Sequence, residues 1–160
     1  MTKTAKTPPS LHTADIPQAD SLPTIRTVVE SVEAVHGDAV GISKRIKVSD
    51  RHVRYRLQSA RVLGLIDENR RLTVRGRELL STSRSSEEER KVLVRAVNAS
   101  LVVSQLFPEL LAVAAVDVDA MAKAISRVTG MSHSTAHRRA RGLRSWRRQL
   151  SSGEDKGEQA

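Results

Sequence analysis

A run of arginines near the end of the chain carries the clearest chemical signal in the sequence. Residues 132–150 contain no acidic residue, and arginine stands at positions 138, 139, 141, 144, 147 and 148. A guanidinium group binds phosphate, and it can hold the O6 and N7 atoms of guanine through two hydrogen bonds. Alanine, leucine and tryptophan recur in the same run at helical spacing. We therefore expect an amphipathic helix with a narrow apolar face, suited to lie against a polyanion.

The same apolar pattern occurs earlier in the chain. Positions 53, 57, 60 and 63 are apolar, and so are positions 136, 140, 143 and 146, at a constant offset of 83. The match extends upstream, because Ile42 corresponds to Ile125 and Ser49 to Ser132. We interpret this as one helix-turn-helix unit that occurs twice.

The composition limits the classes of protein to consider. The chain has 160 residues, 39% of them hydrophobic, and a net charge of +9, which suits one domain or two small ones with a basic surface. A basic folded region points to nucleic acid or an acidic membrane surface as partner. No cysteine is present, so a disulfide framework and a thiolate zinc site are excluded. No apolar run is long enough for a membrane span or a signal peptide, and we expect a cytoplasmic, nucleoid-associated protein.

Capping and turn residues predict the helices of a first unit, residues 22–82, which follows a disordered arm at 1–21. Pro23 lies at the start of its first helix, and Gly37 ends that helix. Asp38 caps a short second helix, and Ser49 caps a third that runs to about Leu63.

The segment after the third helix predicts a β-hairpin. Residues 65–66 form one short strand, residues 67–69 supply the turn, and residues 70–74 form the return strand. A helix near Gly76 follows. Three helices and a hairpin make the winged-helix order, with the hairpin as wing.

The second unit, residues 83–150, is predicted to be helical and to have no wing. Ser86 begins a helix that continues to about Leu106, and a short apolar helix spans residues 110–116. Asp117 and Asp119 cap the next helix, a turn follows at residues 130–132, and the arginine-rich helix runs to about residue 150. The tail 151–160 is expected to be disordered. The predicted fold class is all-α with one small β-hairpin: a winged helix-turn-helix followed by a wingless helical helix-turn-helix unit.

Two regions of the chain resemble a known family. The segments VSDRHVRYRLQSARVLGLID and LTVRGRELL, together with SHSTAHRRARGLRSW, resemble the winged-helix modules attached to bacterial restriction endonucleases and AAA-type ATPases. The match covers roughly residues 40–80 and 130–148. The resemblance implies DNA binding beside a nuclease or an ATPase, and this chain has neither catalytic domain.

The helical register divides the candidate DNA contacts into sets. In the first unit we expect Arg51, Arg54 and Gln58 to contact base edges, since the second helix of such a motif lies in the major groove. Ser49, Tyr55 and Arg61 share that outward surface, although Tyr55 could equally pack on the domain edge. Lys44 and Arg45 on the preceding helix, and Arg70 and Arg71 on the hairpin, are expected to bind phosphates or the minor groove. In the second unit the outward set is Ser134, His137, Arg138, Arg141, Arg144 and Arg148.

The sequence favours a sequence-specific double-stranded DNA-binding protein, either a transcription regulator or the recognition component of a defence or replication system. The alternative is a protein-interaction adaptor whose basic helices dock an acidic partner or RNA. No enzyme motif, metal site or cofactor is predicted. A homodimer or a partner enzyme subunit stays open, because residues 101–116 carry more apolar side chains than a small unit needs.

Overall fold

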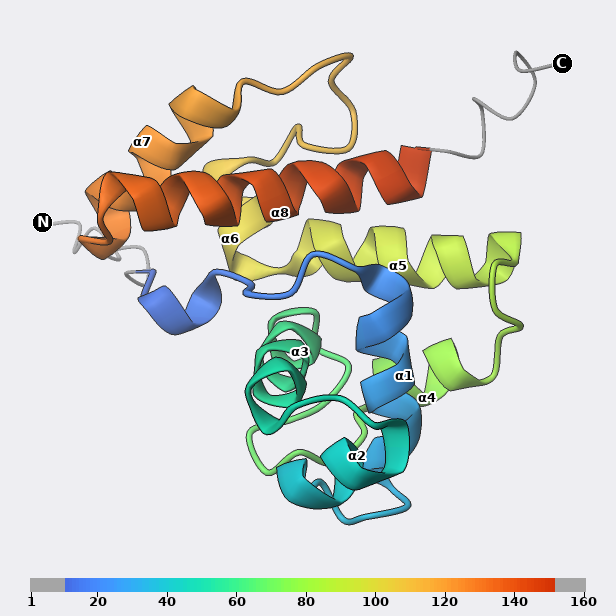
Figure 1. Ribbon diagram of the computed structural model, residues 1–160. Coiled ribbons are helices and arrows are strands. Elements are labelled where there is room, and N and C mark those ends of the chain that lie inside the picture. Colours follow the sequence, from blue (N-terminus) through green and yellow to red (C-terminus); the bar gives the residue numbers. More distant parts are fainter. Residues whose placement is uncertain (1–10, 152–160) are drawn as a thin grey trace, which may run out of the picture.

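The computed structural model describes residues 11–151, and within them the chain is helical with no extended strand (Figure 1). A single 3₁₀ turn, η1, comes first, and α-helices form the rest of the fold. Their bounds are η1 Thr13–Asp15, α1 Leu22–Val32, α2 Ala39–Ile46, α3 Asp50–Val62, α4 Val74–Leu80, α5 Glu87–Ala99, α6 Leu101–Leu106, α7 Val118–Thr129 and α8 His133–Ser151. No helix among residues 11–151 combines the length and the apolar character needed to cross a membrane.

Most helix starts lie where the capping residues predict them. Asp38, Ser49, Ser86 and Asp117 each accept hydrogen bonds from backbone N–H groups in the first turn of the helix that follows. Such bonds satisfy amide groups that have no partner within the helix. The predicted starts of α2, α3, α5 and α7 are therefore confirmed to within a few residues.

The predicted β-hairpin is wrong, and with it the winged-helix fold. Between α3 and α4 the chain makes a tight turn whose only ladder contact is one isolated antiparallel bridge between Ile66 and Leu72. The return strand cannot extend, because Val74 already begins α4. The Thr73 hydroxyl accepts the Gly76 N–H at 3.0 Å and so caps that helix. Helix capping at Thr73 ends the strand after a single paired position.

Two further boundaries differ from the prediction. The helix predicted to reach Leu106 breaks at Ser100, whose ψ of 145° is extended and whose hydroxyl donates to the Val97 carbonyl at 2.6 Å. The short helix predicted at residues 110–116 is instead a series of turns. The Arg147 side chain donates to the Val113 carbonyl in this segment, so this carbonyl accepts a hydrogen bond from α8.

The two helix-turn-helix units repeat the same turn hydrogen bond at the offset read from the sequence. In the α2–α3 pair the Ser43 hydroxyl donates across the turn to the Val48 carbonyl. In the α7–α8 pair the Ser126 hydroxyl donates to the Met131 carbonyl in the same way. Donors and acceptors are both related by 83 residues, so the two turns share one geometry.

Backbone conformation supports the same correspondence. Lys47 and Gly130 occupy equivalent positions, and their φ angles of 55° and 74° are both left-handed. Ser49 and Ser132 then cap the second helices, each accepting at 3.3 Å from the N–H three residues later. These repeated details make chance similarity of composition an insufficient explanation.

Residues 11–21, which we call the strap, are ordered, so the predicted disordered arm is wrong for this part of it. The rest of that arm, residues 1–10, and the predicted tail from residue 152 lie outside the described residues. The strap runs between α3 and α8 (Figure 1), and Ile16 is completely buried. Gln58 Nε2 donates to the carbonyls of Ala14 and Ile16 at 2.7 and 2.9 Å. The Ser59 hydroxyl accepts the Gln18 N–H at 3.1 Å.

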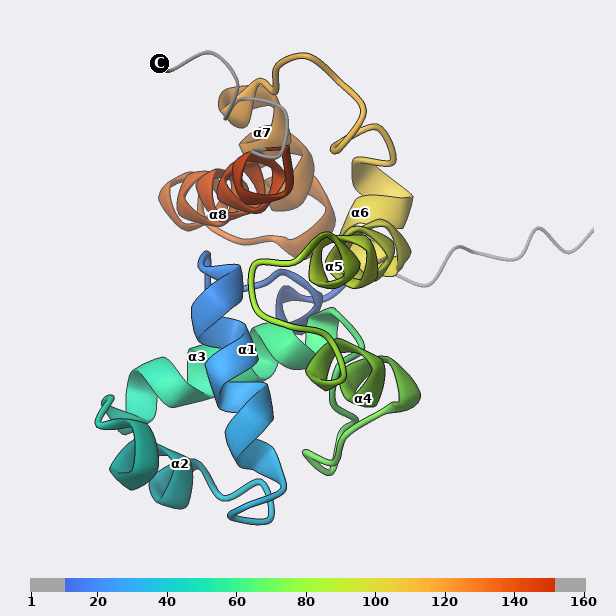
Figure 2. The same cartoon turned by 90° about the vertical axis from the view of Figure 1, so that its right-hand side faces the viewer.

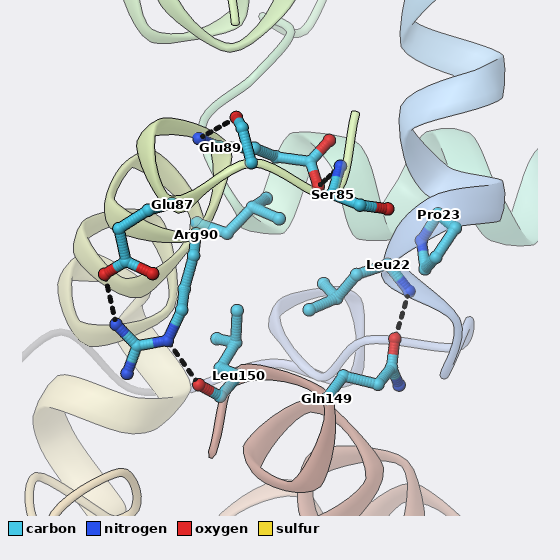
Figure 3. A pocket seen from close by; sticks show the side chains of 10 residues that line it. Leu22, Pro23, Ser85, Glu87, Glu89, Arg90, Gln149 and Leu150 are labelled. Atoms are coloured by element: carbon cyan, nitrogen blue, oxygen red, sulfur yellow. Dashed lines mark hydrogen bonds and ion pairs between the residues drawn. The ribbon is translucent and has the colours of Figure 1, made fainter. Parts of the chain in front are cut away.

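Side chains of α8 hold the strap from its other edge. The hydrogen bonds are Arg139 Nη1 to Ile16 O (3.1 Å), Trp146 Nε1 to Ala19 O (3.1 Å) and Gln149 Nε2 to Asp20 O (2.6 Å). At the end of the strap Gln149 also accepts the Leu22 N–H at 2.8 Å (Figure 3). In the same view Arg90 of α5 donates to the Leu150 carbonyl, which ties α5 to the end of α8.

The two units consequently share one hydrophobic core. Buried side chains of α1, α3, α5, α7 and α8 belong to a single contiguous cluster, and Ile16 of the strap is part of it. Trp146 is fully buried in this cluster, as its place on the apolar stripe predicts. The fold therefore fixes α3 and α8 relative to each other.

Candidate nucleic-acid interface

The open face of α8, which we define as Ser134, His137, Arg138, Arg141, Arg144 and Arg148, contains all the predicted contacts of the second unit. Ser134 and the arginines at 138, 141 and 148 are exposed, and His137 and Arg144 are half-buried. None of its four arginines forms a hydrogen bond or an ion pair with another residue of the described chain. These guanidinium groups are therefore available to an external acceptor.

Packing on two sides explains why these residues point outward. The side of α8 with Ala136, Ala140 and Leu143 is buried, and α7 makes the most extensive helix–helix packing with α8. The adjacent side carries Trp146 and Gln149, which bind the strap. The open face is the part of the α8 surface that neither α7 nor the strap covers.

Two arginines of the same helix have structural partners instead. Arg139 donates to the Ile16 carbonyl; burial and the charge of Arg138 lower its pKa, and Tyr55 partly opposes this effect. Arg147 donates to the Val113 carbonyl, and its Nε is buried with no partner in the described chain. We therefore leave both out of the interface.

On α3 only the first turns stay open. Arg51 and Arg54 are exposed, and Arg51 Nε donates to the Tyr55 hydroxyl at 2.6 Å. The Arg51 guanidinium carbon lies 5.4 Å from the centre of the Tyr55 ring, a cation–π distance. Tyr55 is half-buried and so orients Arg51 at the edge of the domain. Ser49 is exposed and serves as the helix cap.

The strap covers the other half of the predicted α3 surface. Gln58, predicted to contact bases, uses both ends of its amide on strap backbone groups. Arg61 Nη2 donates to the Ala14 carbonyl at 3.2 Å. Gln58 and Arg61 therefore have a structural role. Local sequence patterns could not predict it, because Ala14 of the strap lies more than 40 positions away from both residues along the chain.

The remaining predicted contacts lie apart from these faces. Lys44 and Arg45 are exposed in the last turn of α2. Arg70 and Arg71 are exposed in the turn that replaces the predicted hairpin, and Arg70 donates to the Gly37 carbonyl at 3.2 Å. In place of a wing, Arg70 binds the turn after α1.

Helices of both units that carry these basic residues lie on the same side of the molecule. Figure 2 shows α2, the first turns of α3, and α8 toward the left of the view, with α4, α5 and α6 toward the right. Gln58 of α3 and Arg139 of α8 both donate to the Ile16 carbonyl, so the two helices approach each other across the strap. The basic first turns of α3 and the open face of α8 can therefore address one ligand from one side.

One basic residue of this side was missed by the sequence analysis. Arg127 is exposed in the last turn of α7, at the position that corresponds to Lys44 of α2. The offset of 83 relates Arg127 to Lys44, which is a predicted phosphate contact, so the repeat predicts the same role for Arg127.

Histidines on α8 do not build a metal site within the described residues. His133 Nε2 lies 3.5 Å from Asp119, and the rings of His133 and His137 are 6.0 Å apart. Among residues 11–151 no cluster of three or more His, Asp or Glu side chains could hold a metal ion.

Comparison with protein-family models, with curated proteins and with solved structures gives no significant match to this chain. We therefore infer function from the geometry and chemistry of the residues themselves.

Proposed function

We propose that this protein binds double-stranded DNA through the open face of α8, assisted by Arg51 and Arg54 on α3. The observation that carries the proposal is the open face itself. It presents four arginines with no partner among residues 11–151, and no acidic residue, on a helix fixed from two sides. A rigidly held helix of this kind fits the major groove of B-DNA, which admits one α-helix.

The helical position of each residue suggests its role. The N-terminal half of a recognition helix contacts base edges, so Ser134, Arg138 and Arg141 are the candidates for base contacts on α8. Arg144 and Arg148 lie further along and suit phosphates. Lys44 and Arg127, at equivalent ends of α2 and α7, suit phosphates beside each helix. The proposal includes two roles for such DNA binding: that of a transcription regulator, or that of the recognition component of a larger defence or replication system.

Fluorescence anisotropy with a labelled duplex from a random pool tests the proposal. If about six phosphates are neutralised, the logarithm of the association constant should fall with the logarithm of the salt concentration at a slope of about −5. The double variant Arg138→Ala/Arg141→Ala should lose affinity at every salt concentration and reduce the slope by about 2 if both contact phosphates, or relax sequence preference if they contact bases.

A matched control removes the same charge elsewhere. Lys91 and Arg95 are exposed on α5, a helix that lies toward the right of Figure 2, and Arg95 forms an ion pair with Glu78 of α4. The variant Lys91→Ala/Arg95→Ala should leave both affinity and slope close to the wild-type values. Absence of duplex binding at low salt, or tighter binding to single-stranded RNA or to an acidic peptide, would contradict the proposal.

A further inference from the structure

A second basic site lies at the far end of the first unit from α8. A pocket of about 500 Å³ opens between the turn that follows α1 and the turn that replaces the predicted hairpin. His36, Arg70, Arg71 and Arg77 line it, and Glu33 is its only acidic lining residue.

The backbone around this pocket is held in an unusual conformation. His36 and Arg70 both have left-handed φ angles, 51° and 57°, which non-glycine residues rarely adopt. Gly37 packs so closely on Arg70 that an added Cβ would lie 2.7 Å from the Arg70 Cβ. The Arg70 guanidinium then donates to the Gly37 carbonyl at 3.2 Å, which clamps the two turns together.

Two of the arginines that line the pocket have no side-chain partner within the described chain. Arg71 and Arg77 are exposed, and within the described chain neither side chain has a hydrogen bond or an ion pair. The nearby carboxylate of Asp67 accepts the backbone N–H groups of Asn69 and Arg71 at 2.8 and 3.0 Å, and no ion pair joins it to either arginine side chain within the described chain. Like charges held close together repel each other, and a bound anion would relieve that repulsion.

We propose that this pocket is a phosphate-binding site, with Arg71 and Arg77 as the charged clamp and Arg70 as the residue that fixes its shape. Guanidinium groups match the geometry of phosphate oxygens, and three arginines line this one pocket. The phosphate has two sources: a small phosphorylated molecule free in solution, or the backbone of DNA bound elsewhere on the protein.

Thermal unfolding in the presence of pyrophosphate, at constant ionic strength, tests the first source on the full chain. A ligand at a hundred times its Kd raises the unfolding temperature of a protein of this size by about 5–10 °C. We expect such a rise for the wild type and for Lys91→Ala/Arg95→Ala, and its loss in Arg71→Ala/Arg77→Ala. In NMR spectra of the wild type, the backbone amide signals of residues 36, 37, 70 and 71 should also shift saturably as pyrophosphate is added.

Duplex titration tests the second source, and this part alone rests on the DNA binding proposed above. If pyrophosphate has no effect but Arg71→Ala/Arg77→Ala reduces the salt slope by about 2 relative to the control, the pocket holds a backbone phosphate. If pyrophosphate neither stabilises the protein nor shifts those signals, and duplex binding by the variant equals that of the control, the inference is overturned. If the wild type binds no duplex at all, the proposed function fails, but the pyrophosphate result still tests the pocket by itself.

Discussion

Replacing Ile16 by alanine tests whether the strap joins the two units into one cooperative body. The Ile16 side chain has no exposed surface and belongs to the shared core. Its carbonyl accepts from Gln58 of α3 and Arg139 of α8, so the residue lies at the contact between the helices. Truncating a buried isoleucine to alanine costs about 2–5 kcal/mol. That is a large share of the roughly 5–15 kcal/mol that stabilises a typical domain.

Urea denaturation followed by two signals provides the assay. Trp146 is the only tryptophan and lies in α8, where its indole N–H donates to the strap carbonyl of Ala19, so its fluorescence reports on the second unit. Far-UV circular dichroism reports on all helices. Because the core is continuous, Ile16→Ala should shift both transitions together to lower urea.

A conservative control removes apolar atoms from the surface. Val74 is 81% exposed at the start of α4, so Val74→Ala should change stability by no more than about 0.5 kcal/mol. The reasoning is refuted if Ile16→Ala costs less than about 1 kcal/mol. It is also refuted if the Trp146 transition keeps its wild-type midpoint while circular dichroism shows an earlier step.

Two further predictions concern single residues. Burial raises the pKa of Glu30, but the hydrogen bonds and charges of Arg84 and Arg26 outweigh that effect and hold the pKa below its usual value of 4.5. The stabilisation is therefore present above pH 4.5 and is lost as the pH falls through the lower, folded-state value; Glu30→Gln should flatten this part of the stability–pH curve measured by urea titration. Gly130 has a left-handed φ of 74° and open space around it, so Gly130→Ala should cost only the conformational strain of about 1–2 kcal/mol in thermal or urea unfolding. A much larger loss would mean that the turn, unlike its counterpart at Lys47, tolerates no side chain.

The helices could be predicted because their causes are local. A capping serine or aspartate, an apolar stripe and a terminal glycine all lie within a few residues of the element they determine. The repeat also followed from sequence spacing, and the helical register of residues 132–150 predicted which arginines of α8 point outward. Trp146 was assigned to the core on the same grounds and is completely buried.

The strap and the hairpin could not be predicted because their causes are distant or compete locally. Residues 11–21 have no periodicity, and their order depends on groups of α3 and α8 up to 129 positions away. At the hairpin, alternation of Leu72 and Val74 suggested a strand, but the Thr73 hydroxyl favours a helix cap over the same residues. A strand of one paired position gains too little to compete with that cap.

The strap makes the two copies of the helix-turn-helix unit unequal. At the offset of 83, Gln58 and Arg61 of α3 correspond to Arg141 and Arg144 of α8. In the first copy these positions bind strap backbone, whereas in the second copy they have no partner within the described part of the chain. If both copies meet DNA as we propose, α8 offers the face of a whole helix and α3 only its first turns. The arginines of α8 should then dominate both affinity and salt dependence, while Arg51 and Arg54 extend the contact from the side.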